Sequence, residues 1–292
     1  MLLMNINDIK KVCVVGAGNM GHQISLLAAI SGYKVSCTDI SKEQLQKAEQ
    51  FSIKYIQGRV KKGKLNEEDA KKALNNISFT NDMQEAAKDA DFVIEAATEK
   101  LELKRKIFKQ LDEIAPAHAI LATNSSTLVS SLVADATERP DKVCNMHFFN
   151  PALVMKCVEV VKGSHVSKET AEVTMELCRR LKKEPVLLYK EIEGFLVNRI
   201  LAAINKEAMF LLETGVATAE GIDSAVVNAL GHPMGPFRLL DLTGIDLLYH
   251  ISNESYKKTG DPERRPSPII VEKYVKGEWG EKTGKGFYEY KK

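Results

Sequence analysis

The segment Val12-Cys13-Val14-Val15-Gly16-Ala17-Gly18-Asn19-Met20-Gly21 joins a short apolar run to a Gly-x-Gly-x-x-Gly pattern, and an apolar periodic stretch follows it. This order predicts a strand, a tight turn and a helix. We expect Gly16 to make the turn, Gly18 to let the backbone approach a pyrophosphate, and Gly21 to let the helix pack closely on the strand. The phosphates would lie at the helix N-terminus, where free N–H groups and the helix dipole favour negative charge.

A second expected strand, residues 33–38, ends at Asp39, about twenty residues after the glycine turn, where dinucleotide-binding units carry an acidic residue. Its carboxylate can accept hydrogen bonds from both hydroxyls of an adenosine ribose and would repel a 2′-phosphate. Asp39 therefore favours NAD over NADP as the cofactor. The alternative is a purely structural turn with Asp39 in water.

Length and composition limit the possible classes of protein. A chain of 292 residues exceeds what one core usually serves, so we expect two domains. The net charge of +2 indicates neither a nucleic-acid nor a membrane partner, no apolar stretch reaches transmembrane length, and residues 1–5 are too short and polar for a signal peptide. The odd number and scattered positions of the cysteines indicate reduced thiols in a cytoplasmic protein. They are Cys13, Cys37, Cys144, Cys157 and Cys178.

Strand and helix patterns alternate as far as Leu188, which predicts an α/β doubly wound, Rossmann-like domain over residues 1–193. After Asp39 the expected strands are 77–80, 92–95, 119–123, 143–145, 158–161 and 184–188, and the expected helices are 42–62, 67–74, 101–114 and 168–181. From Gly194 no strand pattern remains. We therefore expect a smaller all-α domain over residues 194–292, with helices at 194–213, at 219–230, from 237 into the 250s, and a short one after the proline-rich segment near 262–268.

Polar residues follow several of the expected strands. Ligands in open α/β sheets bind outside the carboxyl ends of strands, so Glu95 and the run from Asn124 to Thr127 are site candidates by position. The alternatives are a surface acid for Glu95 and a helix N-cap for the polar run.

His147 is the best candidate for an acid/base group. An enzyme that oxidises an alcohol with a nicotinamide cofactor needs a base for the hydroxyl proton, and a histidine at a strand's carboxyl end suits this. Glu159 lies across a turn between two expected strands, so it can hold the far imidazole nitrogen. Ser126 and Asn198 can hydrogen-bond a substrate oxygen. A structural histidine, a surface acid and a helix-packing amide are the alternatives for His147, Glu159 and Asn198.

Lys54 and Lys61 lie two turns apart on the expected helix over residues 42–62 and therefore share a face. They form either a solvated helix face or a cationic patch for a phosphorylated substrate.

Seven motifs in order make the chain resemble the L-3-hydroxyacyl-CoA dehydrogenases over nearly its whole length. They are Val15-Gly-Ala-Gly-Asn-Met-Gly21, Phe92-Val-Ile-Glu-Ala96, Asn124-Ser-Ser126, Met146-His-Phe-Phe-Asn-Pro151, Gly194-Phe-Leu-Val-Asn-Arg199, His232-Pro-Met-Gly-Pro-Phe237 and Lys282-Thr-Gly-Lys-Gly-Phe-Tyr288. The resemblance implies NAD-dependent, reversible oxidation of an L-3-hydroxyacyl-CoA, with 3-hydroxybutyryl-CoA as the expected short-chain substrate.

The resemblance also implies roles for individual residues. His147 is the acid/base, Glu159 its partner, and Ser126 and Asn198 bind the substrate oxygens, while Lys54 and Lys61 contact coenzyme A. Homodimers through the helical domain are usual in the family. The residues expected at the cofactor are Gly16, Gly18, Asn19, Met20, Gly21, Asp39, Glu95, Lys104 and Asn124.

Two departures from the family pattern stand out. The family often has Asn-Thr-Ser-Ser where this chain has Asn124-Ser-Ser-Thr127, so Ser125 or Thr127 could share the role of Ser126. The family usually has proline at the position of Glu193, where it stiffens the linker. Two other functions stay open: a dehydrogenase of a free hydroxy or sugar acid, and a non-enzymatic NAD-binding structural protein. The set of His147, Glu159, Ser126 and Asn198 argues against the latter.

Overall fold

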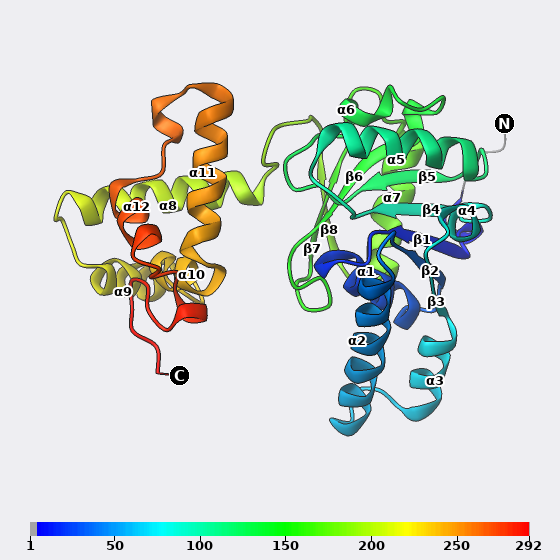
Figure 1. The fold of residues 1–292 in the computed structure, drawn as a ribbon, viewed down its shortest axis with the longest axis horizontal. Helices are drawn as coiled ribbons and strands as arrows, with labels where there is room; N and C mark the ends of the chain where they lie inside the picture. The colour runs from blue at the N-terminus through cyan, green and yellow to red at the C-terminus, as the bar shows by residue number, and fades with distance from the viewer. Residues whose placement is uncertain (1–4, 292) are drawn as a thin grey trace. The chain divides into compact units, whose positions relative to one another are not determined.

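The computed structural model describes residues 5–291 and contains two compact units, Met1–Leu196 and Val197–Lys292 (Figure 1). The division falls three residues after the boundary expected from the sequence. Residues 1–5 were expected to be too short and polar for a signal peptide. Of these, residues 1–4 lie outside the part of the chain that the structure describes. No helix of the described residues is long and apolar enough to cross a membrane.

The first unit is built on one eight-stranded sheet with the order β3-β2-β1-β4-β5-β6-β7-β8. Neighbouring strands pair in parallel except β6 and β7, which are antiparallel. The bounds are β1 Lys11–Val15, β2 Lys34–Thr38, β3 Ile77–Thr80, β4 Phe92–Glu95, β5 Ile120–Thr123, β6 Val143–Phe148, β7 Cys157–Val161 and β8 Glu184–Leu188. The expected doubly wound class is confirmed.

Helices connect these strands at nearly all the expected places. Their bounds are α1 Asn19–Ile30, α2 Lys42–Lys61, α3 Glu67–Asn75, α4 Met83–Ala87, α5 Leu101–Ile114, α6 Ser131–Ala134 and α7 Lys168–Arg180. Ser41 caps α2 with its hydroxyl, as polar residues at this position do. The helices α4 and α6 were not predicted, because segments of five and four residues are too short to show a helical period.

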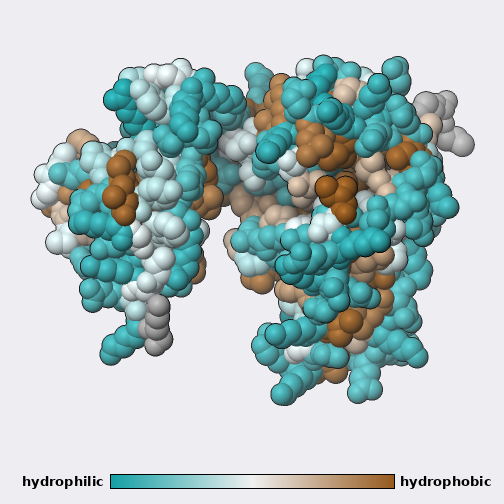
Figure 2. Space-filling model, in the orientation of Figure 1, coloured by the Kyte–Doolittle hydropathy of each residue, from teal (hydrophilic) through white to brown (hydrophobic). Residues whose placement is uncertain are grey.

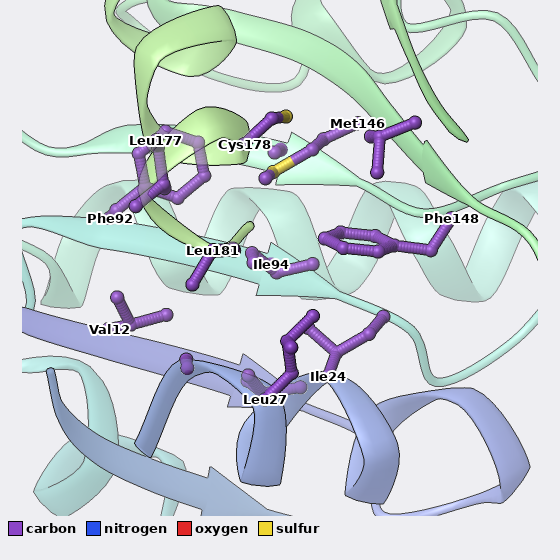
Figure 3. Close-up of a cluster of buried hydrophobic side chains, with 14 of the residues drawn as sticks. Val12, Ile24, Leu27, Phe92, Ile94, Met146, Phe148, Leu177, Cys178 and Leu181 are labelled. Atoms are coloured by element: carbon purple, nitrogen blue, oxygen red, sulfur yellow. The ribbon is translucent and has the colours of Figure 1, made fainter. Parts of the chain in front are cut away.

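The strand residues alternate between two cores, as the period of two in a strand requires. Val12 and Ile94 point toward α1 and α7, where Ile24 and Leu177 meet them (Figure 3). The intervening residues, such as Val93, pack on the other face against side chains of α4, α5 and α6. Both faces of the sheet are therefore covered, as expected for parallel strands.

The ladder pairing brings the carboxyl ends of the central strands together. Val15 pairs with Thr38 and Glu95, Glu95 pairs with Thr123, and Thr123 pairs with Asn145. The strand β6 runs on to Phe148, three residues further than expected, so His147 lies within the strand. The loops that follow these strands form one edge of the sheet.

The second unit is helical, as expected. Its helices are α8 Val197–Glu213, α9 Ala219–Leu230, α10 Pro236–Thr243, α11 Ile245–Thr259 and α12 Pro268–Val275. The expectation of one helix from 237 into the 250s was wrong, because Gly244 has φ 102° and separates α10 from α11. The expected start of the first helix at Gly194 was also early, since residues 193–196 form a turn.

The C-terminal segment of this unit is fastened by a buried carboxylate. Asp241 accepts hydrogen bonds from the backbone N–H of Phe287 and Tyr288 at 2.9 Å each, and from the Tyr290 hydroxyl at 3.0 Å. A buried carboxylate needs such donors to offset its lost hydration.

Candidate active site

The glycine turn has the geometry expected of each of its three glycines. Gly16 has φ 103°, and a Cβ there would lie 2.6 Å from Ala97 Cα. A Cβ at Gly21 would lie 1.7 Å from the Gly16 carbonyl oxygen, so α1 can approach β1 only without a side chain. At Gly18 a Cβ would meet no described atom within 4 Å. The space above Gly18, at the N-terminus of α1, is therefore open to a ligand.

Asn19 and Met20 form the first turn of α1. Asn19 is exposed and donates from Nδ2 to Asn150 Oδ1 at 3.1 Å, which ties the helix start to the loop after β6. Met20 is half-buried and packs on the core beneath the sheet edge.

Asp39 lies at the end of β2 and holds the glycine turn. Its Oδ2 accepts from Ala17 N and its Oδ1 from Ser41 N, both at 2.8 Å. Each carboxylate oxygen has a second lone pair, and the side chain is only half-buried. Asp39 can therefore accept further donors from a ribose without losing these bonds.

Glu95 and Lys104 form an ion pair inside the protein. Glu95 is fully buried and Lys104 is 1% exposed. Glu95 Oε2 contacts Lys104 Nζ and accepts from Thr123 Oγ1 at 3.0 Å, while Oε1 accepts from Ala97 N at 2.9 Å and Thr98 N at 3.4 Å. The pair thus fixes the loop after β4, whose backbone lies directly against Gly16. The alternative of a surface acid at position 95 is excluded by its burial.

The polar run after β5 forms a turn rather than a helix N-cap. Asn124 is buried, and its Oδ1 accepts from Phe148 N at 2.9 Å, which joins this turn to the end of β6. Ser125 is also buried, and its hydroxyl donates to Glu99 Oε2 at 2.5 Å and accepts from Leu128 N at 2.9 Å. The Ser126 hydroxyl makes no hydrogen bond to any described residue. Of the two serines, Ser126 therefore has the hydroxyl available for a ligand.

Glu99 is a residue that the sequence reasoning missed. Its Oε1 accepts from Ser126 N at 3.2 Å, and its Oε2 accepts from Ser125, so it holds the turn that presents Ser126. The only signal in the sequence was that Glu99 is a carboxylate in the loop after β4. The same loop contains Ala97 and Thr98, whose backbone N–H groups donate to Glu95. Nothing along the chain connects position 99 with position 126.

His147 and Glu159 are directly opposite partners in the β6–β7 ladder. The distance from His147 Nδ1 to Glu159 Oε2 is 2.8 Å, and the side chains are 4% and 0% exposed. A carboxylate at Nδ1 keeps a proton there and orients the ring, so Nε2 is the atom free to take or give a proton. No described residue hydrogen-bonds to Nε2. The alternatives of a structural histidine bonded to backbone and a surface strand acid do not match these contacts.

Three further groups surround this pair and were not singled out from the sequence. The ring centroids of Phe149 and Phe195 lie 4.6 Å and 5.4 Å from that of His147. Glu159 Oε1 accepts from the backbone N–H of Leu196 at 2.9 Å. Both oxygens of Glu159 are therefore used, one for the imidazole and one for the chain near residue 196.

Three of the five remaining histidines have other partners. His22 Nδ1 lies 2.7 Å from the Gly18 carbonyl oxygen, and burial lowers the pKa of His22 below its usual value. His118 pairs with Asp91 at 2.9 Å, and His165 Nε2 lies 3.0 Å from the Val143 carbonyl oxygen. None of these three has the buried carboxylate partner that His147 has.

Lys54 and Lys61 are exposed on α2, and neither forms an ion pair with a described residue. The helices α2 and α3 extend together beyond the edge of the sheet, and hydrophilic residues cover their outer ends (Figures 1 and 2). Asn198 is the second residue of α8 in the second unit and is half-buried. The described residues contain no group of three or more His, Cys, Asp or Glu side chains suited to a metal ion.

Comparison with known proteins gives consistent matches along the chain. A family model described as "3-hydroxyacyl-CoA dehydrogenase, NAD binding domain" matches residues 11–192, and one described as the C-terminal domain of this family matches residues 194–290. A probable 3-hydroxybutyryl-CoA dehydrogenase of Bacillus subtilis (strain 168) is 39% identical over 284 residues, which cover 97% of this chain and 98% of that protein.

Two further relatives match the chain over nearly its whole length. The mitochondrial hydroxyacyl-coenzyme A dehydrogenase of Homo sapiens is 37% identical over 289 residues, which cover 97% of this chain and 92% of that protein. The crystal structure of (S)-3-hydroxybutyryl-CoA dehydrogenase PaaH1 from Ralstonia eutropha superposes with a TM-score of 0.89 at 37% identity, over 98% of this chain and 100% of that one.

Proposed function

The chain belongs to the 3-hydroxyacyl-CoA dehydrogenases, which are NAD-dependent oxidoreductases, and on this premise we propose that it interconverts L-3-hydroxybutyryl-CoA and acetoacetyl-CoA with His147 as the acid/base. The substrate is suggested by relatives that carry 3-hydroxybutyryl-CoA in their names. The observation that carries the role of His147 is its buried contact with Glu159 through Nδ1, which leaves Nε2 without a partner among the described residues.

The residues at the glycine turn fit NAD. The open space at Gly18 admits a pyrophosphate to the N-terminus of α1, and Asp39 has acceptor capacity left for ribose hydroxyls. Asn19 and Met20, in the first turn of α1, complete this cradle beside Gly16, Gly18 and Gly21. When bound, NAD would accept the hydride that leaves the alcohol carbon.

Glu95, Lys104 and Asn124 contribute to the cofactor site mainly by holding its loops. The ion pair fixes the backbone after β4, and Asn124 joins the turn after β5 to β6. These contacts hold the two loops rigid, which would lower the entropy lost when NAD binds.

His147 removes the 3-hydroxyl proton in oxidation and returns it in reduction. The proton goes to Nε2, and the positive charge of the resulting imidazolium is stabilised by the Glu159 carboxylate at Nδ1. The rings of Phe149 and Phe195 keep water from the imidazole and so strengthen this interaction.

In this proposal, uncharged hydrogen-bonding side chains and exposed lysines bind the other parts of the substrate. The free hydroxyl of Ser126 and the amide of Asn198 hold the substrate oxygens in this proposal. Lys54 and Lys61 attract the phosphate groups of coenzyme A, because lysines without an ion-pair partner remain available to an anion.

In this proposal, two copies of the chain form a homodimer through their second units. Large apolar side chains are exposed on it, and Figure 2 shows hydrophobic residues at its surface among hydrophilic ones. Such exposure is typical of protein interfaces. The most exposed are Ile200, Phe210, Val216, Leu230, Leu242, Leu247, Ile251 and Val275. We also place the enzyme in the cytoplasm, which agrees with five cysteines that are all free.

The test is NADH formation from L-3-hydroxybutyryl-CoA, with free L-3-hydroxybutyrate as the alternative substrate and NADP as the alternative acceptor. We expect turnover of the thioester with NAD only. His147→Gln should abolish turnover and keep NAD affinity within about twofold, since an amide cannot accept and return a proton. His118→Gln, at an exposed histidine, is the matched control and should retain full activity.

Activity on the free acid alone would replace the proposed substrate with a free hydroxy acid. Full activity of His147→Gln would remove the proposed acid/base role. Binding of NAD without turnover of either substrate would favour the non-enzymatic alternative.

A further inference from the structure

Two consecutive residues with positive φ precede the second unit. Gly194 has φ 77° and Phe195 has φ 50°, and the turn is closed by the Phe195 N–H on the Ile192 carbonyl oxygen at 3.1 Å. A large aromatic residue rarely adopts the left-handed conformation, because its Cβ crowds the backbone. Such strain persists only where the surrounding contacts hold it in place, and it is frequent at functional sites.

The left-handed conformation of Phe195 brings two groups onto the acid/base pair at once. The Phe195 ring is fully buried and lies 5.4 Å from the His147 ring, with an interplanar angle of 51°. The next backbone N–H, that of Leu196, donates to Glu159 Oε1 at 2.9 Å. If residue 195 had an extended backbone conformation, the Leu196 N–H would point away from Glu159, or the ring would point away from His147, or both would.

The two contacts restrict the imidazole in different ways. With Oε1 on Leu196 and Oε2 on His147, the Glu159 carboxylate cannot rotate about its last torsion without losing a buried hydrogen bond. Phe195 and Phe149 pack on the His147 ring and limit its tilt. Glu159 alone would fix only the position of Nδ1.

We infer that the turn of residues 194–196 is a positioning element for His147, which acts through the Leu196 amide on Glu159 and through the Phe195 ring on the imidazole. This inference deepens the proposed function and rests on it for the catalytic consequence. The geometric consequence, a fixed ring with its proton on Nδ1, is independent of the substrate. Phe195 and Leu196 touch neither the reacting atoms nor the cofactor in this scheme.

Phe195→Leu tests the ring, and Phe92→Leu is its matched control. Phe92 is also fully buried but packs in the core on α1 and α7, on the opposite face of the sheet from His147. We expect Phe195→Leu to lower kcat about 10- to 100-fold, because a misplaced catalytic group costs that much, and to leave the Kd for NAD within about twofold. Phe92→Leu should lower stability and leave kcat near that of the unchanged protein.

An ester at position 196 tests the amide. Incorporation of the α-hydroxy acid analogue of leucine removes the N–H and retains every side chain, so the variant decides the matter even if Phe195→Leu fails to fold. We expect kcat to fall at least tenfold. Leu196→Ala keeps the N–H, removes only a side chain that is 43% exposed, and should retain activity.

A spectroscopic readout separates this inference from the proposed function. In the full chain labelled with ¹⁵N-histidine, the His147 signals are those lost in His147→Gln. We expect them to report a proton on Nδ1, and to shift in Phe195→Leu and in the ester variant but not in Phe92→Leu. The inference would be overturned if the His147 signals and kcat were unchanged in both Phe195→Leu and the ester variant. It would also be overturned if Phe92→Leu changed the signals and kcat as much as Phe195→Leu does. An inactive parent protein would overturn the proposed function, and the ¹⁵N signals would still test the turn.

Discussion

Lys104 Nζ contacts Glu95 Oε2 inside the first unit, where both side chains are withdrawn from water. The ammonium also donates to Thr123 Oγ1 at 3.0 Å, and the carboxylate holds the loop after β4. The pair therefore links the ends of β4 and β5 to the start of α5.

Lys104→Met should destabilise the protein by about 3–5 kcal/mol, because it leaves the buried Glu95 carboxylate without its cation. The measurement is urea unfolding followed by circular dichroism. The double variant Glu95→Gln/Lys104→Met should lose less than the single one, since it leaves no buried charge. Lys109→Met changes an exposed lysine on the same helix and should have little effect. Equal losses for Lys104→Met and Lys109→Met would contradict the burial argument.

The two glycines of the turn should respond differently to a methyl group. Gly18→Ala has room in the protein and a φ of −66°, so stability should change by less than about 1 kcal/mol. The methyl would occupy the space proposed for the pyrophosphate and should weaken NAD binding at least tenfold. Gly21→Ala should instead prevent stable folding, because its Cβ would lie 1.7 Å from the Gly16 carbonyl oxygen. Calorimetric titration with NAD and thermal unfolding provide the two readouts, and unchanged NAD affinity in Gly18→Ala would refute the assignment.

Arg139 caps the C-terminus of α5. It donates to Asp112 Oδ1 at 2.6 Å and to the carbonyl oxygens of Asp112 and Pro116. Arg139→Met should therefore cost about 2–4 kcal/mol, since it leaves a carboxylate that is 10% exposed and several carbonyls without a donor. Arg105→Met, which breaks the exposed pair with Asp135, should lower the unfolding midpoint much less. The comparison fails if both variants unfold at the same denaturant concentration.

Alkaline pH should destabilise the protein through its buried thiols. Burial raises the pKa of Cys144 from 9.0 to about 11. Between these values the unfolded thiol loses its proton while the folded thiol keeps it, so the folded state binds more protons and stability falls as pH rises. The contribution of Cys144 is fully present below pH 9 and is lost as pH rises to about 11, at up to about 1.4 kcal/mol per pH unit.

Cys144→Ala tests this by urea unfolding at pH 8, 9, 10 and 11. The variant should show a shallower loss of stability between pH 9 and 11 than the unchanged protein. The Thr174 hydroxyl near Cys144 keeps its bond to the Thr170 carbonyl oxygen, so no polar group is stranded. Cys157→Ala, at a half-buried thiol, should change the slope less. Identical slopes in all three proteins would disprove the assigned role of Cys144.

The sequence by itself determined the order of the strands and of the longer helices of the first unit, and it located the glycine turn between β1 and α1. Both are local properties: a period of two or 3.6 residues, and the space around a residue without a side chain. The break at Gly244 was missed because the apolar period continues across a glycine whose backbone conformation depends on its neighbours.

Only the tertiary structure decided which polar groups meet. Glu99 with Ser125, Lys104 with Glu95, and Leu196 with Glu159 are separated by 26, 9 and 37 residues. Their partners depend on which strands are neighbours in the sheet and on how each loop leaves its strand, and no periodic pattern along the chain records this. His147 and Glu159 could be paired in advance because one hairpin joins β6 to β7. Phe149, which packs on the imidazole, is close in sequence, whereas Phe195 and the Leu196 amide come from a distant part of the chain.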